Sequence, residues 1–194
     1  MNDRKPIRTF LAIELPPGIK YLIEGIKEKL MPELKGIRWI KPEGMHLTLK
    51  FFGDVSQDDV ARISEVIEKN VRDIAPMRLN VGLPGGFPSL KKPRVLWLGT
   101  GGDVQRLTVL HAKIEEDLKG CGFPEEKRPF KPHLTLGRTL SRGGIISGTE
   151  NIIAKTGELG RHRFDVRELI LFKSELKPGG AVYTKLVTFP FGGR

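Results

Sequence analysis

Two copies of the pattern His-Leu-Thr-Leu lie at residues 46–49 and 133–136, which we name the first motif and the second motif. An imidazole with its ordinary pKa of about 6.5 can be a neutral base in one copy and a cationic acid in the other. Threonine hydroxyls can donate hydrogen bonds to the non-bridging oxygens of a phosphate and so stabilise a pentacovalent phosphorus without a metal ion. The motifs therefore indicate phosphodiester chemistry, with proton transfer at His46 and His133 and phosphate contacts at Thr48 and Thr135.

Each motif is predicted to lie in a strand that presents its histidine and threonine on one face. Side chains alternate between the two faces of a strand, so the leucines of each motif point into the core and anchor it. The chain holds four histidines, and two such matches are expected by chance in on the order of one chain in a thousand. Two ordinary half-buried strands are therefore the less favoured interpretation.

Other residues of reactive type have simpler interpretations. His111 shares one helical face with Leu107, Ile114 and Leu118, which predicts a histidine in or beside the core. Aromatic rings can stack on nucleic-acid bases, although core packing is the favoured role for most of them. The candidates are Phe10, Trp39, Phe51 and Tyr183.

Composition limits the classes of protein that the chain can belong to. With 194 residues and 39% hydrophobic residues, it can form one globular domain or two small lobes that share a core. The net charge of +10 favours an anionic partner such as nucleic acid. Cys121 is the sole cysteine, which excludes an intramolecular disulfide and a cysteine-rich zinc site. No apolar run approaches the roughly 20 residues that cross a bilayer, and no signal sequence is evident, so we expect a cytoplasmic protein.

The predicted elements are mixed without a strict strand-helix-strand alternation, which favours the α+β class. Alternating or continuous apolar stretches predict strands at 8–15, 45–52, 77–83, 94–98, 132–138, 168–175 and 182–189. Helices are expected after Pro16-Pro17, after the N-cap residue Ser56 and after Asp103. The density of Pro and Gly predicts loops at 84–88 and over most of 141–160.

The chain resembles the two-histidine (2H) phosphoesterase superfamily, specifically the RNA 2′,3′-cyclic phosphodiesterases often labelled 2′-5′ RNA ligases. The resemblance covers nearly the whole chain. It rests on residues 8–12 (RTFLA), 46–53 (HLTLKFFG), 128–138 (RPFKPHLTLGR) and 173–176 (KSEL), followed by Gly179, Gly180 and Tyr183. It implies a single domain over 1–194 with two antiparallel-sheet lobes, related by a pseudo-two-fold around a central cleft, and helices on the outer faces.

The resemblance also implies roles for individual residues. His46 is expected to be the general acid on the leaving 3′-oxygen and His133 the general base on water, which gives a 2′-phosphomonoester. Arg138 follows the second motif as in the family and is a candidate phosphate ligand. Strict alternation would place it on the opposite face from His133, although Gly137 can end that alternation. The expected partner is RNA with a 2′,3′-cyclic phosphate end, such as a tRNA fragment, bound by a monomer that uses no metal or cofactor.

Two other functions stay open at this point. A 2′-5′ RNA ligase would join the cyclic phosphate to a 5′-hydroxyl at the same site, but water at about 55 M outcompetes an RNA hydroxyl unless binding supplies a large effective concentration. A catalytically silent RNA-binding module would bind RNA without turnover. The intact histidines and threonines of both motifs argue against that module. Hydrolysis is therefore the favoured activity.

Overall fold

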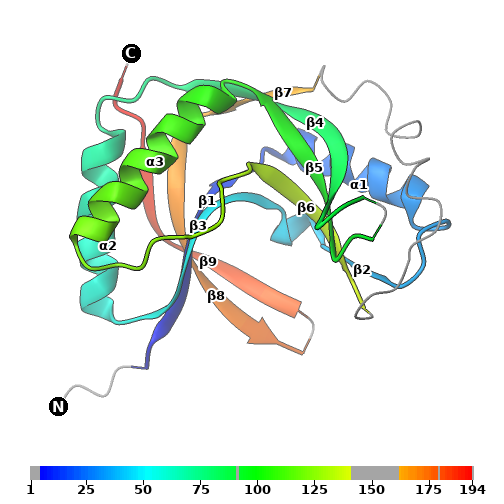
Figure 1. Cartoon of the computed structure of the whole chain (residues 1–194), viewed down its shortest axis with the longest axis horizontal. Helices are drawn as coiled ribbons and strands as arrows, with labels where there is room; N and C mark the ends of the chain where they lie inside the picture. Colours follow the sequence, from blue (N-terminus) through cyan, green and yellow to red (C-terminus); the bar gives the residue numbers. More distant parts are fainter. Residues whose placement is uncertain (1–4, 91, 141–161, 179, 194) are drawn as a thin grey trace.

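The computed structural model describes residues 5–90, 92–140, 162–178 and 180–193. The elements follow in the order β1 (Ile7–Glu14), α1 (Pro17–Leu30), β2 (Ile37–Trp39), the 3-10 helix η1 (Pro42–Gly44), β3 (His46–Val55), α2 (Gln57–Val71), β4 (Met77–Phe87), β5 (Val95–Gly102), α3 (Val104–Gly120), β6 (His133–Thr139), β7 (Arg163–Val166), β8 (Glu168–Lys177) and β9 (Gly180–Pro190) (Figure 1). This arrangement confirms the α+β class. The loop expected at 141–160 lies outside the described residues.

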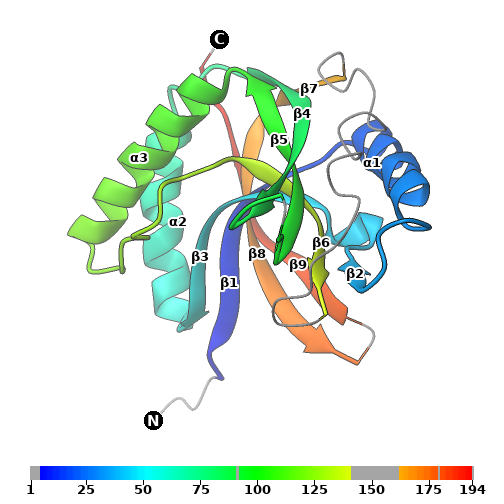
Figure 2. The same cartoon turned by 45° about the vertical axis from the view of Figure 1, so that its right-hand side comes forward.

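The strands form a curled antiparallel sheet in the order β7-β4-β5-β6-β3-β1-β8-β9, with β2 added to β6 (Figure 2). The two predicted antiparallel halves are present, one built from β7, β4, β5, β6 and β2, the other from β3, β1, β8 and β9. They join where Leu47 of β3 pairs with Leu134 of β6. The motif strands therefore lie next to each other in the middle of one continuous sheet.

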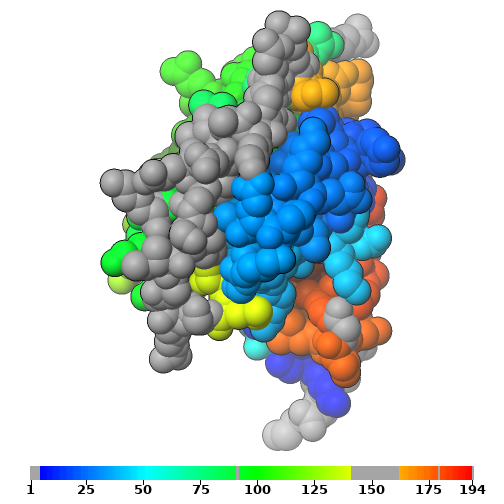
Figure 3. Space-filling view, turned by 90° about the vertical axis from the view of Figure 1, so that its right-hand side faces the viewer, coloured from blue at the N-terminus to red at the C-terminus, as the bar shows by residue number. Residues whose placement is uncertain are grey.

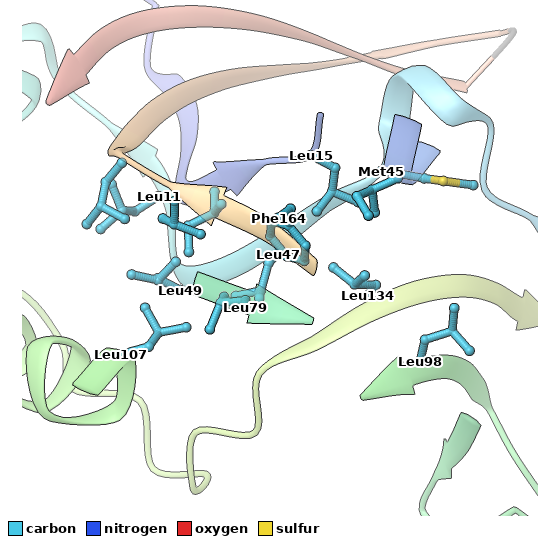
Figure 4. Close-up of a cluster of buried hydrophobic side chains, with 14 of the residues drawn as sticks. Leu11, Leu15, Met45, Leu47, Leu49, Leu79, Leu98, Leu107, Leu134 and Phe164 are labelled. Atoms are coloured by element: carbon cyan, nitrogen blue, oxygen red, sulfur yellow. The ribbon is translucent and has the colours of Figure 1, made fainter. Parts of the chain in front are cut away.

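The three helices contribute to the main hydrophobic core, which lies on one face of the sheet. Leu47, Leu49 and Leu134 of the motifs point into this core together with Leu107 of α3 (Figure 4). On one side of the molecule α1 forms much of the outer surface (Figure 3). No helix in the described part of the chain is long and apolar enough to cross a membrane. The sheet thus has one face covered by helices and another that is available to carry a site.

A local sequence signal explains where α2 begins, whereas the residue predicted to cap α3 has another role. Ser56 forms a capping box with Asp59: the Ser56 hydroxyl accepts a bond from the Asp59 amide, and the Asp59 carboxylate accepts one from the Ser56 amide. Asp103 stands at the start of α3 as predicted, but its side chain does not cap that helix. The carboxylate instead accepts a hydrogen bond of 2.8 Å from the amide of Arg78 and so ties α3 to β4.

The loop predicted at 84–88 is wrong for residues 84–87, which continue β4. A register shift between Val81 and Pro84 gives β4 the irregularity that a proline in a sheet requires. Gly85 pairs with Trp97 of β5, and a Cβ at Gly85 would come within 2.2 Å of the Trp97 ring. The missing side chain therefore leaves room for the indole, whose ring lies 6.0 Å from that of His133.

Candidate active site

The two motifs lie at the starts of neighbouring strands, β3 and β6. Their leucines are buried, with Leu47 and Leu134 exposing 0% and 1% of their surface. The histidines and threonines are half-buried on the opposite face, as strand alternation predicted. His46 and His133 are close enough for the charge of one to lower the pKa of the other, here that of His46. The structure therefore brings the predicted site residues together.

The register of β3 and β6 arranges the motifs crosswise. Because the strands are antiparallel and their leucines are paired, one step along each strand sets His46 opposite Thr135 and Thr48 opposite His133. Directly opposed side chains in an antiparallel pair point to the same face. Each imidazole therefore has the hydroxyl of the other motif across from it, in a local two-fold arrangement.

Aromatic rings enclose His46. The Phe10 ring centroid lies 4.7 Å from that of His46, and Tyr183 meets the imidazole edge-on at 5.2 Å. Phe172 stacks on Phe10 at 5.2 Å. We name Phe10, Tyr183 and Phe172 together the aromatic wall. Burial among these rings lowers the pKa of His46 to about 4, because loss of water disfavours the charged form. In the free protein His46 is therefore neutral at pH 7.

His133 has a separate aromatic surrounding on the other half of the sheet. Phe87 meets its ring edge-on at 5.0 Å, and Trp97 lies tilted at 6.0 Å. Burial again lowers the pKa of the imidazole, and the positive charge of Arg138 lowers it further. Burial thus lowers the pKa of both site histidines.

Each histidine bonds to the backbone carbonyl two residues before it. The Nδ1 atom of His133 lies 2.6 Å from the carbonyl oxygen of Lys131, and His46 bonds to the backbone of Gly44. A carbonyl can only accept, so Nδ1 of His133 carries the proton. The neutral ring then presents Nε2 with a free lone pair, which is the form that a general base needs.

Arg138 lies on the same face as the histidines. The β5–β6 register shifts by one residue, so that Trp97 pairs with Thr135 while Val95 pairs with Arg138. Leu136 is the extra residue, and this bulge ends the strict alternation that would have turned Arg138 away. Its charge lowers the pKa of His133, and at Tyr183, where burial raises the pKa, the same charge opposes that rise. The guanidinium of Arg138 thus lies near His133 and near Tyr183, which contacts His46.

The amino-acid sequence matches the model of the 2′-5′ RNA ligase superfamily over residues 16–178. The chain belongs to this superfamily. A relative from Methanothermobacter thermautotrophicus, named RNA 2′,3′-cyclic phosphodiesterase, is 31% identical and covers 94% of this chain and 98% of its own. A relative of the same name from Thermotoga maritima is 32% identical and covers 96% and 97%. The solved structure of E. coli LigT complexed with 3′-AMP superposes with a TM-score of 0.77 at 28% identity and covers 96% of this chain and 98% of that one.

The remaining predicted candidates in this superfamily member divide between the site and the core. Phe10 and Tyr183 line the site beside His46, whereas Trp39 packs against the main core. Phe51 projects beside Phe10 and exposes 62% of its surface. His111 is 9% exposed on the helix-covered side, which confirms the prediction of a core histidine.

Sequence reasoning did not single out three aromatic residues of the site: Phe172, Phe87 and Trp97. The strands of Phe172 and Trp97 carry apolar side chains on both faces, so the alternation gives no sign of which face meets the histidines. Phe87 lies in the stretch where Pro and Gly predicted a loop. The pairing of β8 with β1 shows which face Phe172 occupies, since Phe172 pairs with Phe10 and shares a small cluster with Phe10 and Ala12. In the described part of the chain, no group of three or more His, Cys, Asp or Glu side chains could hold a metal ion.

Proposed function

We propose that this protein hydrolyses 2′,3′-cyclic phosphate ends of RNA to 2′-phosphomonoesters. The crosswise arrangement of His46 with Thr135 and of Thr48 with His133 carries the proposal, because it gives one phosphate two proton-transfer groups and two hydroxyl donors. Membership in the 2′-5′ RNA ligase superfamily supports it. So do the names of the relatives, which are RNA 2′,3′-cyclic phosphodiesterases at about 30% identity over nearly the whole chain.

The proton transfers follow from the two histidines. His133 takes a proton from water through Nε2 as the water oxygen bonds to phosphorus, and His46 gives a proton to the 3′-oxygen as its bond to phosphorus breaks. The sugar keeps the phosphate on its 2′-oxygen. One water is consumed, and a proton then passes from His133 to solvent while His46 regains one. Neither step calls for a metal or cofactor.

Hydroxyl and guanidinium donors take the role of a metal in this mechanism. Thr48 and Thr135 donate hydrogen bonds to the non-bridging oxygens, where charge builds up in the transition state. Arg138, on the same face, adds a fixed positive charge that a phosphate can bind through two parallel hydrogen bonds. Negative charge on the reacting phosphorus is thus stabilised by the protein's own side chains.

Binding of the substrate favours the protonated, charged form of His46, which is the form that the general acid needs. Burial keeps His46 neutral in the free protein, with a pKa of about 4. An anionic phosphodiester placed beside a buried imidazole favours the imidazolium and raises its pKa. The protonated acid therefore forms when the phosphate binds, and the aromatic wall keeps the charge pair away from bulk water.

An RNA oligonucleotide ending in a 2′,3′-cyclic phosphate tests the proposal directly. The expected product is a monophosphate that resists a 3′-specific phosphatase, since the phosphate remains on the 2′-oxygen. A predominant 3′-phosphate would mean that acid and base are exchanged. Addition of an oligonucleotide with a 5′-hydroxyl separates the alternatives: a 2′-5′ linked product in excess over hydrolysis indicates a ligase, and binding without any product indicates a silent RNA-binding module.

A further inference from the structure

A buried ion pair joins β3 to α3 on the face of the sheet opposite the histidines. Lys50 and Glu115 expose 5% and 8% of their surface. The ammonium group lies 2.7 Å from one carboxylate oxygen and 2.8 Å from the other. Burying two charges costs several kcal/mol per ion before their attraction offsets it, so such a pair is weak evidence for a contribution to stability. Its neighbours indicate a different role.

The ion pair holds residues 123–132, which we name the approach segment because they lead from α3 to β6. This segment contains no helix or strand. Lys50 Nζ donates to the carbonyl of Pro124 at 2.8 Å, and the carboxylate of Glu115 accepts from the amide of Glu126 at 3.3 Å. The first half of the approach segment is thus fixed to both β3 and α3.

A stacked pair of rings fixes the second half. Phe130 of the approach segment lies parallel to His111 of α3, with ring centroids 3.9 Å apart and 5° between the planes. His111 Nε2 lies 3.2 Å from the carbonyl of Leu49 and donates to it, since a carbonyl can only accept. The stack therefore connects the approach segment to the strand of the first motif.

The approach segment carries the carbonyl that orients His133. Lys131 follows Phe130 directly, and its oxygen accepts the Nδ1 proton of His133 at 2.6 Å. Because the approach segment contains no helix or strand, the position of the Lys131 carbonyl depends on the side-chain contacts that hold the segment. We propose that Lys50, Glu115, His111 and Phe130 are positioning residues that keep the Lys131 carbonyl in place and so hold His133 in its Nδ1–H tautomer, with Nε2 free. Lys50 stands two residues after Thr48, so the strand of the first motif also helps to position His133, the proposed general base in the second motif.

The effect on turnover rests on the proposed function, whereas the effect on the imidazole does not. The test is a long-range nitrogen–proton NMR spectrum of the His133 ring at a pH where both site histidines are neutral. The wild-type protein is expected to show the Nδ1–H tautomer. The variant Lys50→Met/Glu115→Leu replaces the ion pair with apolar side chains of similar volume, a change that proteins often tolerate. It is expected to show a mixture of the two tautomers at His133, with His46 unchanged.

Phe130→Leu is the second variant, because it leaves the ion pair intact and removes the stacked ring from a half-exposed position. It should shift the His133 tautomer in the same direction. On the cyclic phosphate substrate, both variants should lose roughly 10- to 100-fold in kcat, the scale of a misplaced catalytic group, with KM changed by less than about threefold. Asn70→Leu is the matched control: it removes a partly buried hydrogen bond between α2 and α3, to Asp117, and should leave the His133 spectrum and kcat unchanged.

An unchanged His133 tautomer in both folded variants would overturn the proposal. So would an equal loss of kcat in the Asn70→Leu control, because that result would indicate a general structural effect. If the wild-type protein shows no turnover at all, the proposed function fails, and the tautomer spectra still decide whether the approach segment positions His133.

Discussion

Leu47 of β3 and Leu134 of β6 pair at the junction of the two halves of the sheet, and both side chains are buried in the main core. Because strand side chains alternate, a slip of one residue in either strand would turn its imidazole and hydroxyl into that core. The apolar anchors therefore fix which face carries the chemistry. The same pair sets the crosswise relation in which each histidine faces the threonine of the other motif.

Loss of either threonine hydroxyl should slow the reaction without changing its pH dependence. Thr48→Ala and Thr135→Ala are expected to lower kcat by about 10- to 10³-fold, since each removes one hydrogen bond to the developing charge and leaves proton transfer intact. Thr48→Ser and Thr135→Ser keep the hydroxyl and should lose far less. Steady-state kinetics on a cyclic mononucleotide measures the difference. Equal losses in the Ala and Ser variants would contradict a role for the hydroxyl.

Phosphate binding should be coupled to proton uptake. At pH 6 the free His46 imidazole is almost fully neutral, because burial lowers its pKa to about 4. An anion beside it raises that pKa, so the bound state holds more protons than the free state. Calorimetry of a nucleoside 2′-monophosphate in buffers of different ionisation enthalpy counts the protons. The His46→Phe variant should take up fewer protons on nucleotide binding than the wild type does. Equal proton uptake by both proteins would exclude His46 as the group that becomes charged.

Longer RNA should bind with a steeper dependence on salt than a mononucleotide. The net charge of +10 allows contacts to additional phosphates, and each contact releases condensed counterions. The comparison is the KM of an oligonucleotide with a cyclic phosphate end against that of a cyclic mononucleotide over a series of salt concentrations. Parallel salt dependences would show that the basic surface does not contact RNA beyond the terminal nucleotide.

Chelation of metals should leave the rate unchanged. The proposed site stabilises charge through Thr48, Thr135 and Arg138 and moves protons through the two histidines, so EDTA has no group to remove from it. The assay compares initial rates before and after dialysis against EDTA. A strong loss of activity that zinc or manganese reverses would contradict this mechanism.

The sequence was sufficient to predict the faces of both motifs, because buried leucines alternate with the histidines and threonines. It was also sufficient for the start of α2, where Ser56 forms its cap. It could not place Arg138, because the bulge at Leu136 depends on the register between β5 and β6. Nor could it identify Phe172 as a neighbour of the histidines, since β8 is apolar on both faces and has no pattern to distinguish them. Phe87 was missed because the Pro and Gly residues around it predicted a loop.

The central claim is that His46 and His133 act as one acid–base pair, and the pH dependence of kcat/KM in single histidine variants tests it most directly. The wild type should give a bell with both limbs, centred below the ordinary imidazole pKa of about 6.5, because burial lowers the pKa of both histidines in the free protein. His46→Ala and His133→Ala should each lose on the order of 10²- to 10⁴-fold and one limb of the bell. The double variant should lose less than the product of the two, as expected for residues that act together. A His46→Ala or His133→Ala variant that kept the wild-type rate and both limbs would contradict the account.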